Sequence, residues 1–190
     1  MLRRPQNTSN PQERRSDTQL ERLSAAAAGV PFRGVDSDGN PAVHTHLRAP
    51  ASTGQTLSTE SFCHKVPVVM VFLPEAESAR TTLSDYDTAR ADLAHRRVQL
   101  LAVLPEPASD ARGVADRMQL TYPLLADPSL DIFREFGATD ASGEPQTCSV
   151  INDRTGTVAA KTDGVLSPSE TTTQLDDLEG SSRFEMAVNR

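Results

Sequence analysis

The chain has only two cysteines, Cys63 and Cys148, among its 190 residues. Two cysteines are too few for the disulfide framework of a small secreted domain. No apolar run approaches the roughly 18–20 residues that a helix needs to span a bilayer. The N-terminal residues also lack the apolar segment of a secretory signal peptide. These absences predict a cytoplasmic protein that is not embedded in a membrane.

Lysine is also scarce, since Lys65 and Lys161 are the only two and arginine supplies the other positive side chains. The formal net charge is −7 and the pI is about 5.1. A nucleic-acid-binding protein normally presents a basic face, so this class is disfavoured. Hydrophobic residues make up 37% of the chain, which is below the usual share and predicts that some segments lie outside the core.

The length favours one domain with modest extensions. Residues 1–15 are rich in Asn, Gln, Pro and Arg and have little to bury, which predicts a disordered tail. Residues 16–28 combine capping-box spacing with apolar residues at helical spacing, which predicts a short helix. We expect the main domain over residues 29–180 and a loose C-terminus over residues 181–190.

The main domain is organised around an unbroken apolar run at residues 66–73, which ends at Pro74. A run without polar alternation predicts a strand that is buried on both faces. A helix is predicted over residues 78–95, so its N-terminus follows the carboxyl end of that strand. In open α/β sheets this position usually holds the chemistry. The free N–H groups at residues 78–82 could bind an anion with the help of Arg80, although simple helix capping is the favoured interpretation.

Further elements follow in the order strand, helix, short strand, helix, hairpin and helix. An opening hairpin is predicted before the central strand, around the turn at residues 38–41. This order predicts an α/β fold of thioredoxin-like layout, in which helices flank a central mixed sheet. The later elements are predicted at residues 98–104, 108–120, 122–126, 127–136, 147–161 and 167–178.

Four motifs along this order resemble those of one known family. They read FLPEAESARTT at 72–82, VQLLAV at 98–103, YPLLADP at 122–128 with FREFG at 133–137, and SVINDRTG at 149–156. They are similar to the motifs of the peroxiredoxins, the alkyl-hydroperoxide-reductase/thiol-specific-antioxidant group, and most closely to the bacterioferritin-comigratory or Q type. The resemblance covers roughly residues 29–162. It implies a peroxiredoxin-type three-layer sandwich and an antioxidant thiol peroxidase.

The sequence departs from that family at the catalytic residues. The resemblance places the peroxide-attacking cysteine at Thr81, where a hydroxyl cannot replace a thiolate and forms no sulfenic acid. No cysteine lies between Cys63 and Cys148, so a small shift of the alignment does not restore one. Ser78 keeps the hydroxyl of the family's threonine, and the family's later arginine falls near the uncharged Gln146.

The position of a nearby resolving cysteine falls on Tyr86. The resemblance therefore implies the loss of the nucleophile, the resolving thiol and the cation together. The first hypothesis is a non-catalytic binding or scaffold relative, whose partner is an unknown protein or small molecule. Homodimerisation is a further hypothesis, because the family's fold often pairs.

The second hypothesis is a thiol oxidoreductase that uses Cys63, with Cys148 as resolving thiol and a thioredoxin-type reductant. His64 and Lys65 could make the Cys63 thiol reactive, whereas the alternative is a loop cysteine without a role. A buried, inert Cys148 is equally typical of a strand. No cofactor is expected. A metal site of His44 and His46, completed by Cys63 or His64, is disfavoured because His-x-His spacing is a weak signal.

Overall fold

The computed structural model describes residues 47–188, with side chains placed as far as Glu179. The predicted tail at 1–15, the predicted helix at 16–28, most of the predicted opening hairpin, and the histidines His44 and His46 lie outside these residues.

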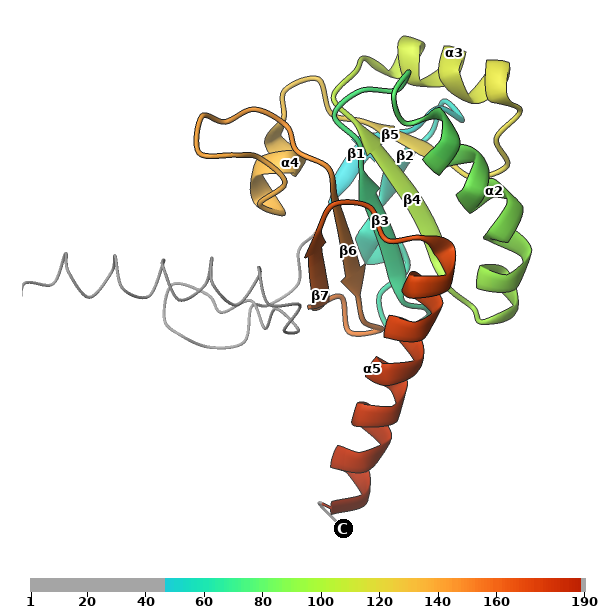
Figure 1. Cartoon of the computed structure of the whole chain (residues 1–190), viewed down its shortest axis with the longest axis vertical. Coiled ribbons are helices and arrows are strands. Elements are labelled where there is room, and N and C mark those ends of the chain that lie inside the picture. Colours follow the sequence, from blue (N-terminus) through green and yellow to red (C-terminus); the bar gives the residue numbers. More distant parts are fainter. Residues whose placement is uncertain (1–46, 189–190) are drawn as a thin grey trace, which may run out of the picture.

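A five-stranded mixed sheet occupies the centre of the domain, in the order β5-β4-β3-β6-β7 (Figure 1). The central strand β3 (Val68–Phe72) pairs in parallel with β4 (Gln99–Leu104) and antiparallel with β6 (Cys148–Asn152). The outer strands are β5 (Leu124–Ala126), parallel to β4, and β7 (Val158–Asp163), antiparallel to β6. The predicted mixed sheet and the predicted C-terminal hairpin are therefore confirmed.

A separate two-stranded sheet joins β1 (Arg48–Pro50) and β2 (Thr56–Ser58) in antiparallel register. The short 3-10 helix η1 (Thr59–Ser61) follows β2. Ala51 also forms an isolated antiparallel bridge with Leu125 of β5. The hairpin of β1 and β2 is thus attached to the edge of the main sheet beside β5.

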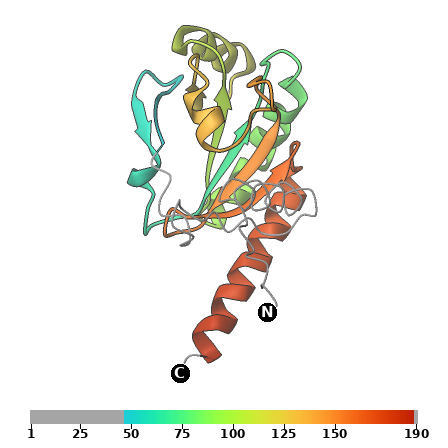
Figure 2. The same cartoon turned by 90° about the vertical axis from the view of Figure 1, so that its left-hand side faces the viewer.

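Helices cover both faces of the main sheet (Figures 1 and 2). One face carries α2 (Arg80–His95), α3 (Ala108–Met118) and α5 (Pro168–Val188), and the opposite face carries the short α4 (Asp131–Glu135). The described residues therefore form three layers, which confirms the predicted α/β sandwich.

The central strand β3 lies between two hydrophobic cores. Val69 and Val71 belong to the core beneath α2, α3 and α5, whereas Val68, Met70 and Phe72 belong to the core beneath α4. All five residues are at most 3% exposed. Successive side chains of a strand point to opposite faces, so an apolar run without polar alternation is what a strand between two helical layers needs.

The short helix α4 begins later than predicted. The sequence predicted a helix from Asp127 with Pro128 at its first position, but the helix begins at Asp131, after Leu130 with a φ of 60°. The Asp127 carboxylate accepts hydrogen bonds from the backbone N–H groups of Asp131 (3.1 Å) and Phe133 (2.9 Å). The Asp127 side chain therefore caps the helix as predicted, but Asp127 lies four residues before the first helical residue instead of directly before it.

The helix α5 confirms one prediction and corrects another. The predicted capping box is present, since the Ser167 hydroxyl accepts from the Glu170 N–H (3.3 Å) and the Glu170 carboxylate accepts from the Ser167 N–H (2.7 Å). The helix does not end at Leu178 as predicted but continues to Val188. The prediction of a loose segment is therefore wrong for residues 181–188. The single Gly180 costs only about 1 kcal/mol within a helix and does not stop this one.

Ionisation of Glu170 is expected to make the stability of α5 depend on pH. Hydrogen bonds from Ser167 lower the pKa of the Glu170 carboxyl. The ionised Glu170 carboxylate therefore contributes fully to the free energy of unfolding above its unfolded-state pKa of about 4.3. This contribution is lost as the pH falls through its lower folded-state pKa. We expect Glu170→Gln to flatten the decline of the urea-unfolding free energy at acidic pH, relative to wild type. Glu75→Gln, at an exposed position of the β3–α2 loop, is the control. If the unfolding free energy of Glu170→Gln declined at acidic pH as steeply as that of this control, the ionised Glu170 would not stabilise the fold.

Candidate functional site

The loop between β3 and α2 leads into Thr81, the position at which the resemblance placed the family's nucleophile. Within the loop, Leu73, Ala76 and Ala79 are buried. The helix begins at Arg80, and Thr81 is exposed in its first turn. The buried alanines and leucine hold the loop on the domain, so the hydroxyl of Thr81 stands at the surface where a helix N-terminus follows the central strand.

The polar side chains around Thr81 interact locally. The Ser78 hydroxyl donates a hydrogen bond to the carbonyl of Glu75 (3.2 Å), and Arg80 forms an ion pair with Glu77 (3.2 Å). Ala79 is the N-cap residue of α2 and supplies no side-chain cap. Arg80 is thus already matched by a carboxylate, which weakens the hypothesis of an anion site, and Ser78 does not cap the helix.

Gln146 lies in the loop between α4 and β6, where it is exposed. Its backbone N–H donates to the carbonyl of Ala138 (2.8 Å). Gln146 precedes Cys148, which pairs with Phe72 at the end of β3, so it belongs to the same end of the sheet as Thr81. Among the described residues, no hydrogen bond joins Gln146 to Ser78 or Thr81.

Two buried tyrosines fix the first half of α2. The Tyr86 hydroxyl donates to the carbonyl of Leu166 (2.8 Å) and accepts from the hydroxyl of Thr171 (2.8 Å). The Tyr122 hydroxyl donates to the carbonyl of Leu83 (2.9 Å). Burial raises the pKa of both tyrosines, so both hydroxyls stay protonated. Tyr86, at the position that the resemblance gave to a resolving cysteine, is therefore an anchor between α2 and the start of α5.

We expect Tyr86→Phe to lower the free energy of unfolding by about 1–3 kcal/mol. The substitution leaves the buried Leu166 carbonyl and Thr171 hydroxyl without this partner, and an unsatisfied buried polar group costs about that much. Tyr122→Phe, which removes one hydrogen bond, is the matched control and should cost less. Urea denaturation of both variants tests this, and an unchanged midpoint for Tyr86→Phe would show that the hydroxyl does not anchor α5.

Cys63 follows η1 and is half-buried. Its thiol contacts the carbonyl of Thr155, in the turn between β6 and β7, at 3.4 Å. The ammonium of Lys65 donates to the carbonyl of Ser61 (2.9 Å). His64 has a left-handed φ of 60°. The proposed activation of the thiol by Lys65 therefore gains no support, because that ammonium is engaged elsewhere.

Cys148 is the first residue of β6 and is 2% exposed. Burial raises the pKa of its thiol to about 12, and the charge of Lys161 opposes that rise only in part. The thiol is therefore protonated at neutral pH. This environment matches the buried, inert cysteine that was the alternative to a redox role.

The two cysteines lie toward opposite ends of β6. Cys148 begins this strand, whereas Cys63 contacts Thr155 beyond its other end at Asn152. Four steps of about 3.3 Å separate the ends of the strand by roughly 13 Å. A disulfide requires Cα atoms within about 7 Å. Both thiols are free, and the structure does not bring them together.

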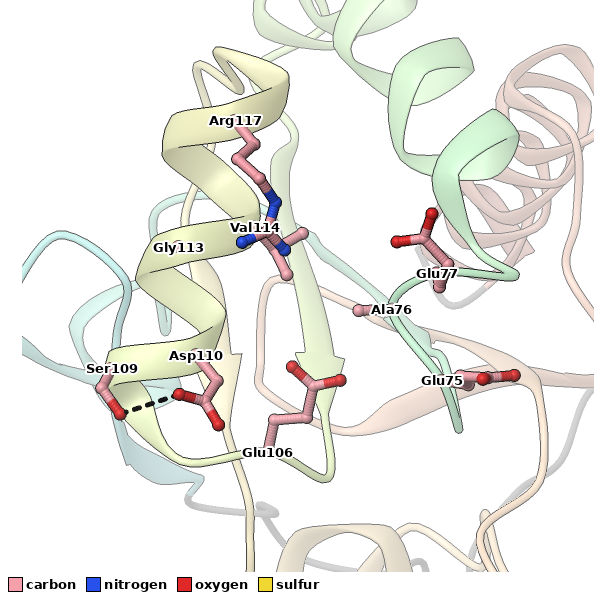
Figure 3. Close-up of a pocket in the computed structure, with 9 residues that line it drawn as sticks. All are labelled: Glu75, Ala76, Glu77, Glu106, Ser109, Asp110, Gly113, Val114 and Arg117. Atoms are coloured by element: carbon pink, nitrogen blue, oxygen red, sulfur yellow. Dashed lines mark hydrogen bonds between the residues drawn. The ribbon is translucent and has the colours of Figure 1, made fainter.

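An open cavity of about 510 Å³ lies between the β3–α2 loop and α3 (Figure 3). Four carboxylates and one guanidinium line it, together with the small apolar side chains of Ala76 and Val114. The Ser109 hydroxyl donates to the Asp110 carboxylate at 3.1 Å. This charge balance favours cations over anions. No local sequence pattern indicates the cavity, because its residues come from segments about 30 positions apart. The lining consists of Glu75, Ala76, Glu77, Glu106, Ser109, Asp110, Gly113, Val114 and Arg117.

Among residues 47–179, whose side chains the structure describes, no group of three or more His, Cys, Asp or Glu side chains is placed to hold a metal ion. Within residues 47–188, no helix is both long and apolar enough to cross a membrane.

The model of the AhpC/TSA family matches residues 39–161. The chain belongs to the AhpC/TSA family. No curated protein matches the sequence.

Several solved structures share the fold of this chain. BcpB, a peroxidoxin of Mycobacterium tuberculosis, has a TM-score of 0.64 at 18% identity, over 73% of this chain and 95% of its own. AhpC of Enterococcus faecalis has a TM-score of 0.65 at 20% identity, over 73% and 91%. Peroxiredoxin Q of Xanthomonas campestris has a TM-score of 0.62 at 15% identity, over 70% and 90%. These likenesses establish the peroxiredoxin-type, thioredoxin-like fold that the motifs implied.

Proposed function

We propose that this AhpC/TSA protein is a non-catalytic relative of the peroxiredoxins that acts by binding an unknown protein partner or small molecule. One observation carries the proposal: Thr81, and no cysteine, stands in the first turn of α2 after the central strand. The AhpC/TSA membership supplies the scaffold but does not supply the nucleophile.

The chemistry of peroxide reduction makes Thr81 decisive. A thiolate attacks one peroxide oxygen, an S–O bond forms as the O–O bond breaks, and the second oxygen leaves with a proton. A helix N-terminus can hold a cysteine as thiolate near neutral pH, but a threonine hydroxyl stays protonated there. The uncharged Gln146 and the pairing of Arg80 with Glu77 also fit a site without peroxidase function.

The alternative is a thiol oxidoreductase that uses Cys63. The half-buried thiol at the surface of the β6–β7 turn supports it. Cys148 is disfavoured as the resolving thiol because it is buried and lies far from Cys63. This alternative therefore needs a second thiol from outside the chain, such as a thioredoxin-type reductant.

Peroxide consumption with dithiothreitol or a thioredoxin system separates the two proposals. We expect wild type, Cys63→Ser and Cys148→Ser to match the rate of buffer with reductant alone. Turnover by wild type that Cys63→Ser abolishes and Cys148→Ser preserves would instead support the oxidoreductase. Turnover that survives in a Cys63→Ser/Cys148→Ser double variant would point to a contaminant, since that protein contains no thiol.

A further inference from the structure

We draw no further inference here: the strongest candidate, the open cavity between the β3–α2 loop and α3, is defined only by a cluster of exposed or half-buried carboxylates with one arginine, and nothing in residues 47–188 points to a ligand for it.

Discussion

In the folded protein, the thiol of Cys148 is expected to react with a neutral alkylating reagent at pH 7 at least about 30-fold more slowly than an unperturbed thiol. Burial raises its pKa from 9.0 to about 12, so the thiolate fraction at pH 7 falls by a factor on the order of 1,000. The greater nucleophilicity of a more basic thiolate offsets this by roughly 15–30-fold. Burial at 2% exposure slows the reaction further.

The Cys63→Ser variant isolates Cys148 for this measurement, and mass spectrometry of the alkylated protein follows its rate. Cys148→Ser is the matched control, in which the half-buried Cys63 remains. The rate at Cys148 should keep rising about tenfold per pH unit above pH 9, because its thiol is still mostly protonated there. Full reactivity should return in denaturant. Equal native rates at the two cysteines would remove the main argument against Cys148 as a redox partner.

Phe133→Ala is expected to lower the free energy of unfolding by about 3–5 kcal/mol, as phenylalanine truncations in cores do. The ring is fully buried and packs edge-on against Phe72 of β3, with 5.2 Å between centroids and 79° between planes. Phe136 contacts the same Phe72 ring at 5.5 Å. Since domains are stable by only about 5–15 kcal/mol, this variant should lose a large part of the total.

Urea denaturation measures this loss, and Phe133→Leu is the control because it keeps much of the apolar volume. We expect the leucine variant to lose clearly less than the alanine variant. A cost below about 1 kcal/mol for Phe133→Ala would show that α4 contributes little to the packing of its face of the sheet.

The central strand was predictable because a short, continuous, β-branched apolar run is typical of a strand that is buried on both faces. The run that Pro74 ends matches β3 within two residues at each end. The capping box at Ser167 and Glu170 was equally local, since both partners are three residues apart. Such features can be predicted because all the residues that interact lie within a few positions of one another in the sequence.

Other features depend on contacts that no local pattern contains. The late start of α4 follows from a left-handed Leu130, which its residue type does not favour. The anchoring role of Tyr86 depends on Leu166 and Thr171, which lie about 80 positions away. The distance between Cys63 and Cys148 could not be predicted from the sequence, because it depends on the position of β6 in the sheet. The position of Thr81 at the N-terminus of α2 was predictable because strand, loop and helix are consecutive.

The antiparallel pairing of β3 with β6 has a consequence for synthesis of the protein. Phe72 at the end of β3 and Asn152 at the end of β6 are about 80 residues apart. At about 5–20 residues per second, the ribosome needs roughly 4–16 s to cover that distance. Until then, one edge of the most apolar strand has no partner, and unpaired strand edges promote aggregation. Nascent chains that stop before β6 should therefore depend on chaperones, although they already contain the whole Thr81 region.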